Sequence, residues 1–162
     1  MGKKLFLVCA ILTGSLTSFS QTILLTDNGR IEVNGSLGYW RDSTHSVPFE
    51  SLNDSEFHPY KSAYSPNIGF DRSAHWFKLV LTNQSQAGEW LMELPYAPLD
   101  QIDFYVAGSD STFLHKVTGD HFPIAERDLS HRHPIFTFGI APGQSTIIYV
   151  RVQSISSVQV PI

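Results

Sequence analysis

The residues AHWFKLVLT, 74–82, form the clearest strand pattern in the sequence, because large apolar residues recur at every second position. The pattern ends at a turn, Asn83-Gln84-Ser85. Successive side chains of a strand point to opposite faces, so Phe77, Leu79 and Leu81 share one face. A row of large apolar side chains on one face indicates that this face is buried against another layer. The stretch therefore predicts a core strand of a β-protein.

Similar patterns continue along the chain, separated by Gly, Pro, Asn and Ser, and no helical period is sustained. Three more apolar rows are expected in the core: Trp90, Met92 and Leu94; Phe136, Phe138 and Ile140; and Ile148, Val150 and Val152. The pattern is typical of a sandwich or barrel, and four rows favour an all-β antiparallel sandwich of two sheets. Strands are expected over 74–82, 89–94, 101–106, 112–117, 134–140, 144–153 and 157–162.

The region before residue 72 is less regular. We expect His45–Tyr64 to form a long loop with short strands, folded over one edge of the sandwich, with Trp76 partly buried beneath it. Tyr39 and Trp40 are adjacent, so on a strand they would face opposite ways, one toward the core and the other toward the surface. The sequence leaves open which residue takes which side.

The N-terminus carries an export signal. Lys3 and Lys4 precede an apolar run over 5–12, and Ser18 and Ser20 provide a small-x-small cleavage site. We expect residues 1–20 to be a signal peptide and 21–162 to be one exported domain. The single cysteine, Cys9, lies within this signal, so thiol catalysis, zinc–thiolate sites and disulfides are excluded for the mature domain. The alternative is an N-terminal strand or helix of the core.

Composition and motifs narrow the function further. The chain has 11 Lys and Arg against 15 Asp and Glu, and the basic residues are scattered, so we expect no nucleic-acid partner. The sequence has no Ser nucleophile elbow, phosphate loop, H-E-x-x-H or paired-Cys motif. We therefore predict a non-enzymatic domain without catalytic residues or a cofactor.

An ordered series of landmarks gives a family resemblance. Its members are Asn67-Ile68-Gly69, Trp76 and Trp90 on consecutive strands, Gly119-Asp120, Arg127, His131-Arg132-His133-Pro134, and a final strand with Tyr149, Arg151 and Ser154. This series, over roughly residues 25–162, resembles the type 2 extracellular domain of the bacterial seven-transmembrane receptors with diverse intracellular signalling modules.

The resemblance implies a jelly-roll β-sandwich similar to carbohydrate-binding modules, on the outer face of the cytoplasmic membrane. It also implies seven membrane helices further along a complete receptor, coupled to a histidine kinase, a diguanylate cyclase or a similar output module. The implied ligand is a small molecule, with sugars as the usual proposal. Because the sequence stops at Ile162, the chain is either a fragment of a receptor or a free-standing sensor. The alternative function is a secreted carbohydrate-binding or adhesion module without a receptor.

Seven residues are predicted to bind the ligand. Arginine side chains present planar donor pairs that suit carboxylates and sugar hydroxyls, and aromatic faces suit sugar rings. An alternative for the loop residues is a brace in which Asp120 pairs with an arginine, and an alternative for Tyr149 and Arg151 is a solvated strand face. The predicted residues are Asp120, Arg127, His131, Arg132, His133, Tyr149 and Arg151.

A metal site is the remaining possibility in this region. His131 and His133 would point to one face of a strand and, with Asp120, offer three ligands, which His121 or His115 would complete. Such a site would suit a metal-assisted hydrolase using Asp120, His131 and His133. The alternative is that both histidines are polar groups at the rim of the domain. We adopt that interpretation and predict no metal site.

Overall fold

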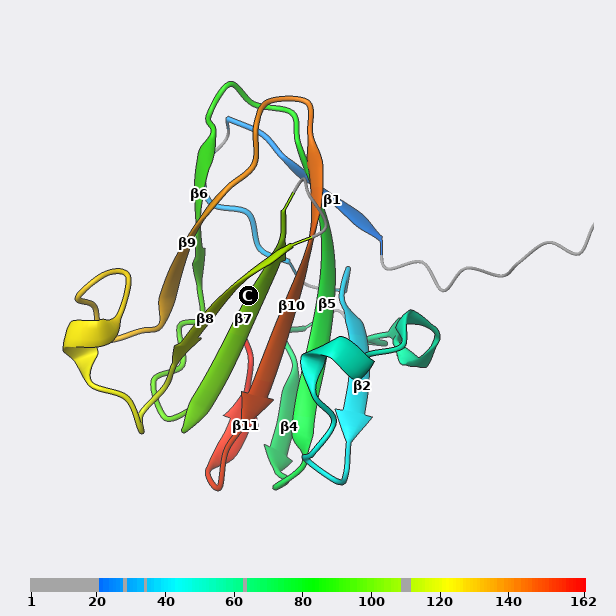
Figure 1. Ribbon diagram of the computed structural model, residues 1–162, viewed down its shortest axis with the longest axis vertical. Coiled ribbons are helices and arrows are strands. Elements are labelled where there is room, and N and C mark those ends of the chain that lie inside the picture. The colour runs from blue at the N-terminus through cyan, green and yellow to red at the C-terminus, as the bar shows by residue number, and fades with distance from the viewer. Residues whose placement is uncertain (1–20, 28, 34, 63, 109–111) are drawn as a thin grey trace, which may run out of the picture.

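The computed structural model describes residues 21–162 except 28, 34, 63 and 109–111, so the predicted signal peptide lies outside the described residues. The described chain folds almost entirely into strands joined by loops and three short 3₁₀ helices (Figure 1). The strands are β1 (Thr22–Leu25), β2 (Gly38–Asp42), β3 (His58–Pro59), β4 (Asn67–Phe70), β5 (Ala74–Asn83), β6 (Glu89–Glu93), β7 (Gln101–Ala107), β8 (Phe113–Thr118), β9 (Ile135–Gly139), β10 (Ser145–Gln153) and β11 (Ser157–Gln159). The 3₁₀ helices are η1 (Phe49–Ser51), η2 (Asp54–Glu56) and η3 (Ile124–Glu126).

One large sheet forms the first layer of the molecule. Its strands run in the order β3-β2-β5-β10-β7-β8, and β1 also pairs with β5. The second layer consists of two separate antiparallel pairs, β6–β9 and β4–β11, which lie beside different parts of the large sheet (Figure 1). The predicted β-sandwich is confirmed. The β1–β5 pair is parallel, which the antiparallel prediction did not include.

The main core lies between these layers, and the predicted apolar rows form it. The phenyl rings of Phe104 and Phe136 stack across the two layers, with centroids 4.4 Å apart and planes 7° from parallel. The predicted row of β6 is buried at Met92 and Leu94, whereas Trp90 is half-buried at its border. Other residues of the predicted rows that are buried in this core are Phe77, Leu79, Leu81, Phe138, Ile140, Ile148, Val150 and Val152.

The outer face of the large sheet is also buried in part. Trp76 and Tyr149 lie on this face, and Phe57 packs against them in a second apolar cluster. Phe57 ends the segment 43–57, which we call the covering loop. Phe49 of this loop reaches as far as β7, where its ring stacks on Tyr105 with the centroids 4.1 Å apart.

The predicted position of the covering loop was wrong, and the structure shows which sides Tyr39 and Trp40 take. We expected the loop at one edge of the sandwich, but it lies over the outer face, because the aromatic side chains of β5, β7 and β10 provide an apolar surface there. Trp76 is fully buried, not only partly. Tyr39 packs against the main core and Trp40 against the second cluster, so neither lies simply at the surface.

Candidate ligand-binding site

A network of polar side chains lies on the outer face of the large sheet, beside the covering loop. Alternate residues of β7 and β10 point to this face, and the register places Asp103 directly opposite Arg151. Arg151 Nη1 lies 3.2 Å from Asp103 Oδ2. Gln101 Nε2 donates to the same oxygen at 2.9 Å, and His115 Nε2 lies 3.1 Å from Asp103 Oδ1. Three neighbouring side chains therefore hold Asp103 in one orientation.

This network borders a hollow of about 250 Å³. One wall comes from Trp76, Asp103, Tyr105 and Arg151 on the sheet, and the other from residues 45–49 of the covering loop. The Arg151 guanidinium lies over the Trp76 ring, 5.9 Å from its centroid. A second hollow of about 250 Å³ shares His45 and Gln101 with the first. Two adjoining hollows thus carry polar groups, and aromatic rings line the first of them.

The polar groups of the first hollow are held largely out of solvent. The side chains of Arg151 and Asp103 are only 12% and 8% exposed. Arg151 Nη2 also donates to Gln153 Oε1 at 2.7 Å and to the His45 carbonyl at 3.2 Å, which ties the covering loop to β10. Burial raises the pKa of Tyr105 to about 12, and the charge of Asp103 adds to the effect, so the phenol stays protonated near neutral pH.

Such a site is suited to a ligand that carries several hydroxyl groups. Fixed charged groups make stronger hydrogen bonds to hydroxyls than neutral groups do. A hydroxyl that leaves water for this site needs partners, because an unpaired buried polar group costs about 1–3 kcal/mol. Asp103 accepts, Arg151 donates, and Gln101 does both.

The profile of the 7TMR-DISM extracellular 2 family matches residues 34–162 of this chain. The chain belongs to this family. It is therefore an extracytoplasmic sensor domain of a membrane receptor. No curated protein matches the chain. Within the part of the chain that the structure describes, no helix is both long and apolar enough to cross a membrane.

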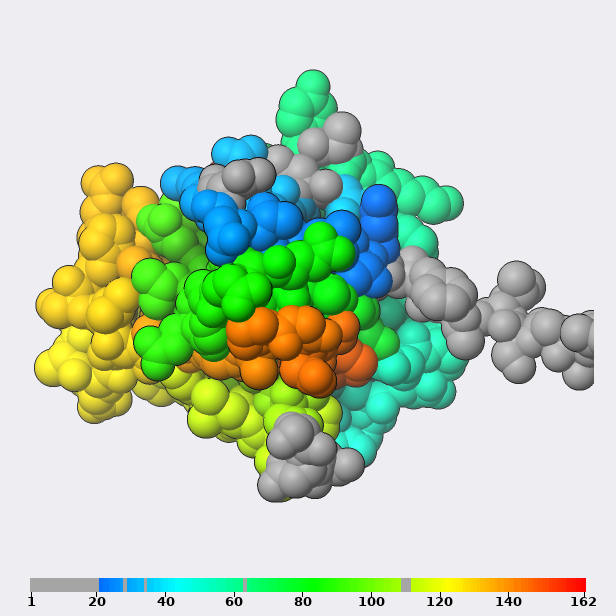
Figure 2. Space-filling view, turned by 90° about the horizontal axis from the view of Figure 1, so that it is seen from above, coloured from blue at the N-terminus to red at the C-terminus, as the bar shows by residue number. Residues whose placement is uncertain are grey.

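The predicted site residues of this 7TMR-DISM extracellular 2 domain do not gather in one place. Arg151 lines the first hollow. Tyr149 lies on the same face, but the covering loop buries it and its hydroxyl donates to Asp54 Oδ1 at 2.8 Å, so it is neither an open platform nor part of a solvated face. The other predicted residues belong to the segment 120–133, which projects on the opposite side of the molecule from the covering loop (Figure 2). They are Asp120, Arg127, His131, Arg132 and His133. Their role in ligand binding stays a prediction.

Arg127 braces this projecting segment. Its Nη1 donates to the carbonyl oxygens of His131 and Arg132 at 2.8 and 3.1 Å, and its Nη2 donates to the carbonyl of Gly119 at 3.4 Å. The alternative of a brace between Asp120 and an arginine is not found among the described residues: Arg127 braces the segment through carbonyl oxygens, and Asp120 is exposed. The side chain of Arg132 is exposed as well.

His131 and His133 lie beside a carboxylate that the sequence analysis did not select. Their ligand atoms and those of Glu93 on β6 all lie within 4.8 Å of one another, and His133 Nδ1 is 2.8 Å from Glu93 Oε1. Among the described residues, Asp120 is not part of this group. His121 Nε2 lies 3.8 Å from Asp100 Oδ1 and His115 Nε2 lies 3.1 Å from Asp103 Oδ1, and neither histidine belongs to the group of Glu93, His131 and His133.

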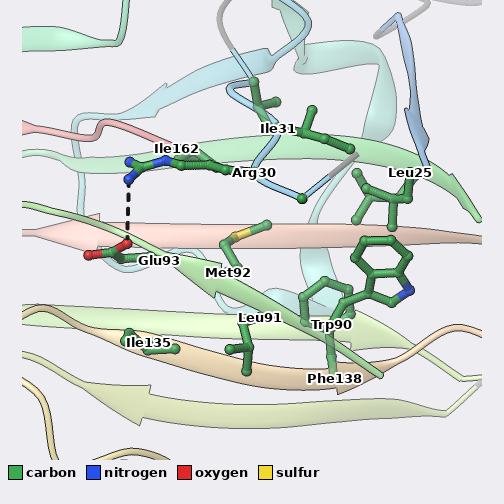
Figure 3. Close-up of a pocket in the computed structure, with 13 residues that line it drawn as sticks. Leu25, Arg30, Ile31, Trp90, Leu91, Met92, Glu93, Ile135, Phe138 and Ile162 are labelled. Atoms are coloured by element: carbon green, nitrogen blue, oxygen red, sulfur yellow. Dashed lines mark ion pairs between the residues drawn. The ribbon is translucent and has the colours of Figure 1, made fainter. Parts of the chain in front are cut away.

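An apolar groove of about 310 Å³ lies beside Glu93, which is one of its lining residues (Figure 3). Arg30 Nη1 and Glu93 Oε2 form an ion pair of 3.9 Å at one end, Met92 lies in the middle, and Leu25 and Trp90 lie toward the other end. The Trp90 indole N–H is buried without a hydrogen-bond partner among the described residues. From the sequence, Trp90 was predicted as a core residue and as a family landmark, and this groove was not predicted.

Proposed function

We propose that this domain senses a carbohydrate or a related polyhydroxylated small molecule for a bacterial receptor of the seven-transmembrane type. In this proposal the ligand occupies the hollow between β7, β10 and the covering loop. The complete receptor then carries seven membrane helices and a histidine kinase, diguanylate cyclase or similar module on the cytoplasmic side. Family membership supports the receptor context and favours it over a secreted adhesion module.

The pairing of Asp103 with Arg151 beside Trp76 and Tyr105 carries the ligand proposal. It places a fixed acceptor and a fixed donor within hydrogen-bond reach of each other, at the border of the hollow. The rings of Trp76 and Tyr105 support these groups, since Trp76 is fully buried and Phe49 and His115 stack on Tyr105. Both groups are already ordered by Gln101, His115 and Gln153, so a ligand would lose little free energy in organising them. The hollow is slightly smaller than the range of about 300–1,000 Å³ typical of drug-sized ligands, which favours a ligand of one or two rings.

Thermal unfolding of residues 21–162 against a panel of sugars, sugar acids, amino acids and amines tests this proposal. A ligand that binds only the folded protein, at 100 times its Kd, adds about 2.7 kcal/mol to the free energy of unfolding. For a domain of this size that raises Tm by several degrees. A rise confined to one class of hydroxylated compound is the expected result.

Three variants locate the binding. Gln101→Ala removes a side chain shared by both hollows and should reduce the ligand-induced rise in Tm. Gln86→Ala makes the same chemical change at an exposed turn position and should leave the rise intact. A rise that persists in Gln101→Ala and Arg151→Ala, with both variants folded, would place the ligand elsewhere. Membrane helices encoded beyond Ile162 would support the receptor context, and a stop codon there would favour the secreted module.

A further inference from the structure

We propose that Glu93, His131 and His133 form a binding site for a borderline divalent transition-metal ion such as Zn²⁺. Two imidazoles and one carboxylate are a ligand set that zinc accepts, with a fourth position left for water or another molecule. Their chemistry is poorly suited to Mg²⁺ or Ca²⁺, which prefer oxygen ligands. This inference is independent of the sugar-binding proposal, which uses different residues.

The geometry needs only small movements to bind a metal. In a tetrahedral zinc site with bonds of about 2.0–2.1 Å, neighbouring ligand atoms are about 3.3 Å apart. The ligand atoms of the three side chains already lie within 4.8 Å of one another. The two imidazole rings have centroids 5.2 Å apart and planes at 79°, so they do not stack against each other. The His131 side chain is exposed, and its Nδ1 accepts a hydrogen bond of 3.2 Å from the His133 N–H, which the ring gives up if it turns toward Glu93.

The backbone beneath the three side chains is fixed by long-range contacts. Antiparallel pairing of β6 with β9 places Glu93 opposite Ile135, and the Leu94 N–H donates to the Pro134 carbonyl at 2.9 Å. Glu93 is thereby held beside the end of the histidine segment. Arg127 holds the other side of that segment through the carbonyl oxygens of His131 and Arg132. Contacts outside the three side chains therefore fix the backbone that carries them.

The two carboxylate oxygens of Glu93 face different partners, which suits binding of a metal through one of them only. Its Oε1 faces His133 at 2.8 Å, while its Oε2 faces Arg30 Nη1 at 3.9 Å. A metal bound through Oε1 leaves Oε2 available to Arg30. Arg30 would then orient the carboxylate, as charged or hydrogen-bonded neighbours commonly orient metal ligands.

Isothermal titration of ZnCl₂ into untagged, chelator-treated residues 21–162 tests the site. We expect one Zn²⁺ per chain, and binding at least ten times weaker in each of His131→Ala, His133→Ala and Glu93→Gln. His58→Ala, which removes an exposed histidine on β3, should leave the affinity unchanged. Co²⁺ in place of Zn²⁺ should give the visible absorption of a tetrahedral site in the wild type and not in His131→Ala.

The results separate this inference from its alternatives. The absence of saturable zinc binding would overturn it, and so would binding that all three variants retain. His131→Ala keeps the test decisive if Glu93→Gln or His133→Ala fails to fold, because the His131 side chain is exposed. Because the hollow shares no residue with the metal site, a sugar-induced rise in Tm should survive in His131→Ala, so each proposal can fail without the other.

Discussion

The hydroxyl of Tyr149 on β10 donates a hydrogen bond of 2.8 Å to Asp54 in the covering loop, across 95 residues of sequence. Asp54 Oδ2 also lies 2.7 Å from Lys78 Nζ on β5. Burial alone would raise the pKa of Asp54, but the hydrogen bonds from Lys78 and Tyr149 outweigh it and hold the pKa below its ordinary value. One carboxylate therefore fastens the covering loop to two strands of the sheet.

Asp54→Ala should loosen the covering loop. We expect the free energy of unfolding to fall by about 1 kcal/mol, below the range of about 1.5–3 kcal/mol for hydrogen bonds to a charged group, because the Asp54 side chain is 60% exposed. Urea denaturation measures the change, and Glu56→Ala in the same 3₁₀ helix provides the control. In a double-mutant cycle with Tyr149→Phe the two losses should not add, and full additivity would show that the contact contributes nothing.

Asp42 should make the stability of the domain fall in acid. It is buried at the start of the covering loop and accepts from the Thr44 hydroxyl and from the N–H groups of Thr44 and Val47 at 2.6, 2.9 and 3.0 Å. Burial would raise its pKa, but these hydrogen bonds dominate and lower it. Because the folded pKa lies below the unfolded value of about 3.9, the stabilisation is present above that pH and is lost as pH falls through the folded pKa.

The comparison of Asp42→Asn with wild type measures this contribution. Between pH 5 and pH 2, the free energy of unfolding of the wild type should fall more steeply than that of the variant. Asp27→Asn, at an exposed position, should follow the wild type. Parallel curves for wild type and Asp42→Asn would assign the acid sensitivity to other carboxylates, such as Asp128, whose pKa is lowered by Lys116 and Thr137 against the effect of burial.

Gly119→Ala should be strongly destabilising. Gly119 has φ +143°, and a Cβ there would lie 2.2 Å from the Asp100 carbonyl oxygen, which is backbone and has little room to move. We expect a loss of more than about 2 kcal/mol in the free energy of unfolding. Gly88→Ala, where a Cβ meets nothing within 4 Å, should change stability by less than about 0.5 kcal/mol. Similar effects of the two substitutions would contradict this role for Gly119.

Local patterns were sufficient to predict most of the sandwich. The expected strand 74–82 became β5, and the rows led by Phe77, Phe136 and Ile148 became the core, because period-two alternation depends only on neighbouring residues. The short strands β1 and β4 lack such a pattern and were not predicted. The position of the covering loop was wrong for a related reason, since contacts such as Tyr149–Asp54 join residues far apart in the sequence.

The candidate sites were harder to predict than the fold. Arg151 was selected, but its partner Asp103 was not, although Gln101, Asp103 and Tyr105 form a visible alternating row on β7. Glu93 was not linked to His133 because they are 40 residues apart and only the β6–β9 pairing brings them together. Arg127 was identified as a possible brace, but its acceptors are carbonyl oxygens, which carry no signal in the side-chain sequence.

Burial of the large sheet on both faces has a consequence for how the domain can respond to a ligand. The cluster beneath the covering loop is much smaller than the main core, so opening the loop exposes less apolar surface than global unfolding does. Amides of residues 43–57 should therefore exchange with solvent through local opening, while those at the centre of β5 and β10 exchange only when the domain unfolds. A ligand held by both His45–Phe49 and β10 would shift the population toward the closed loop without rearranging the sandwich.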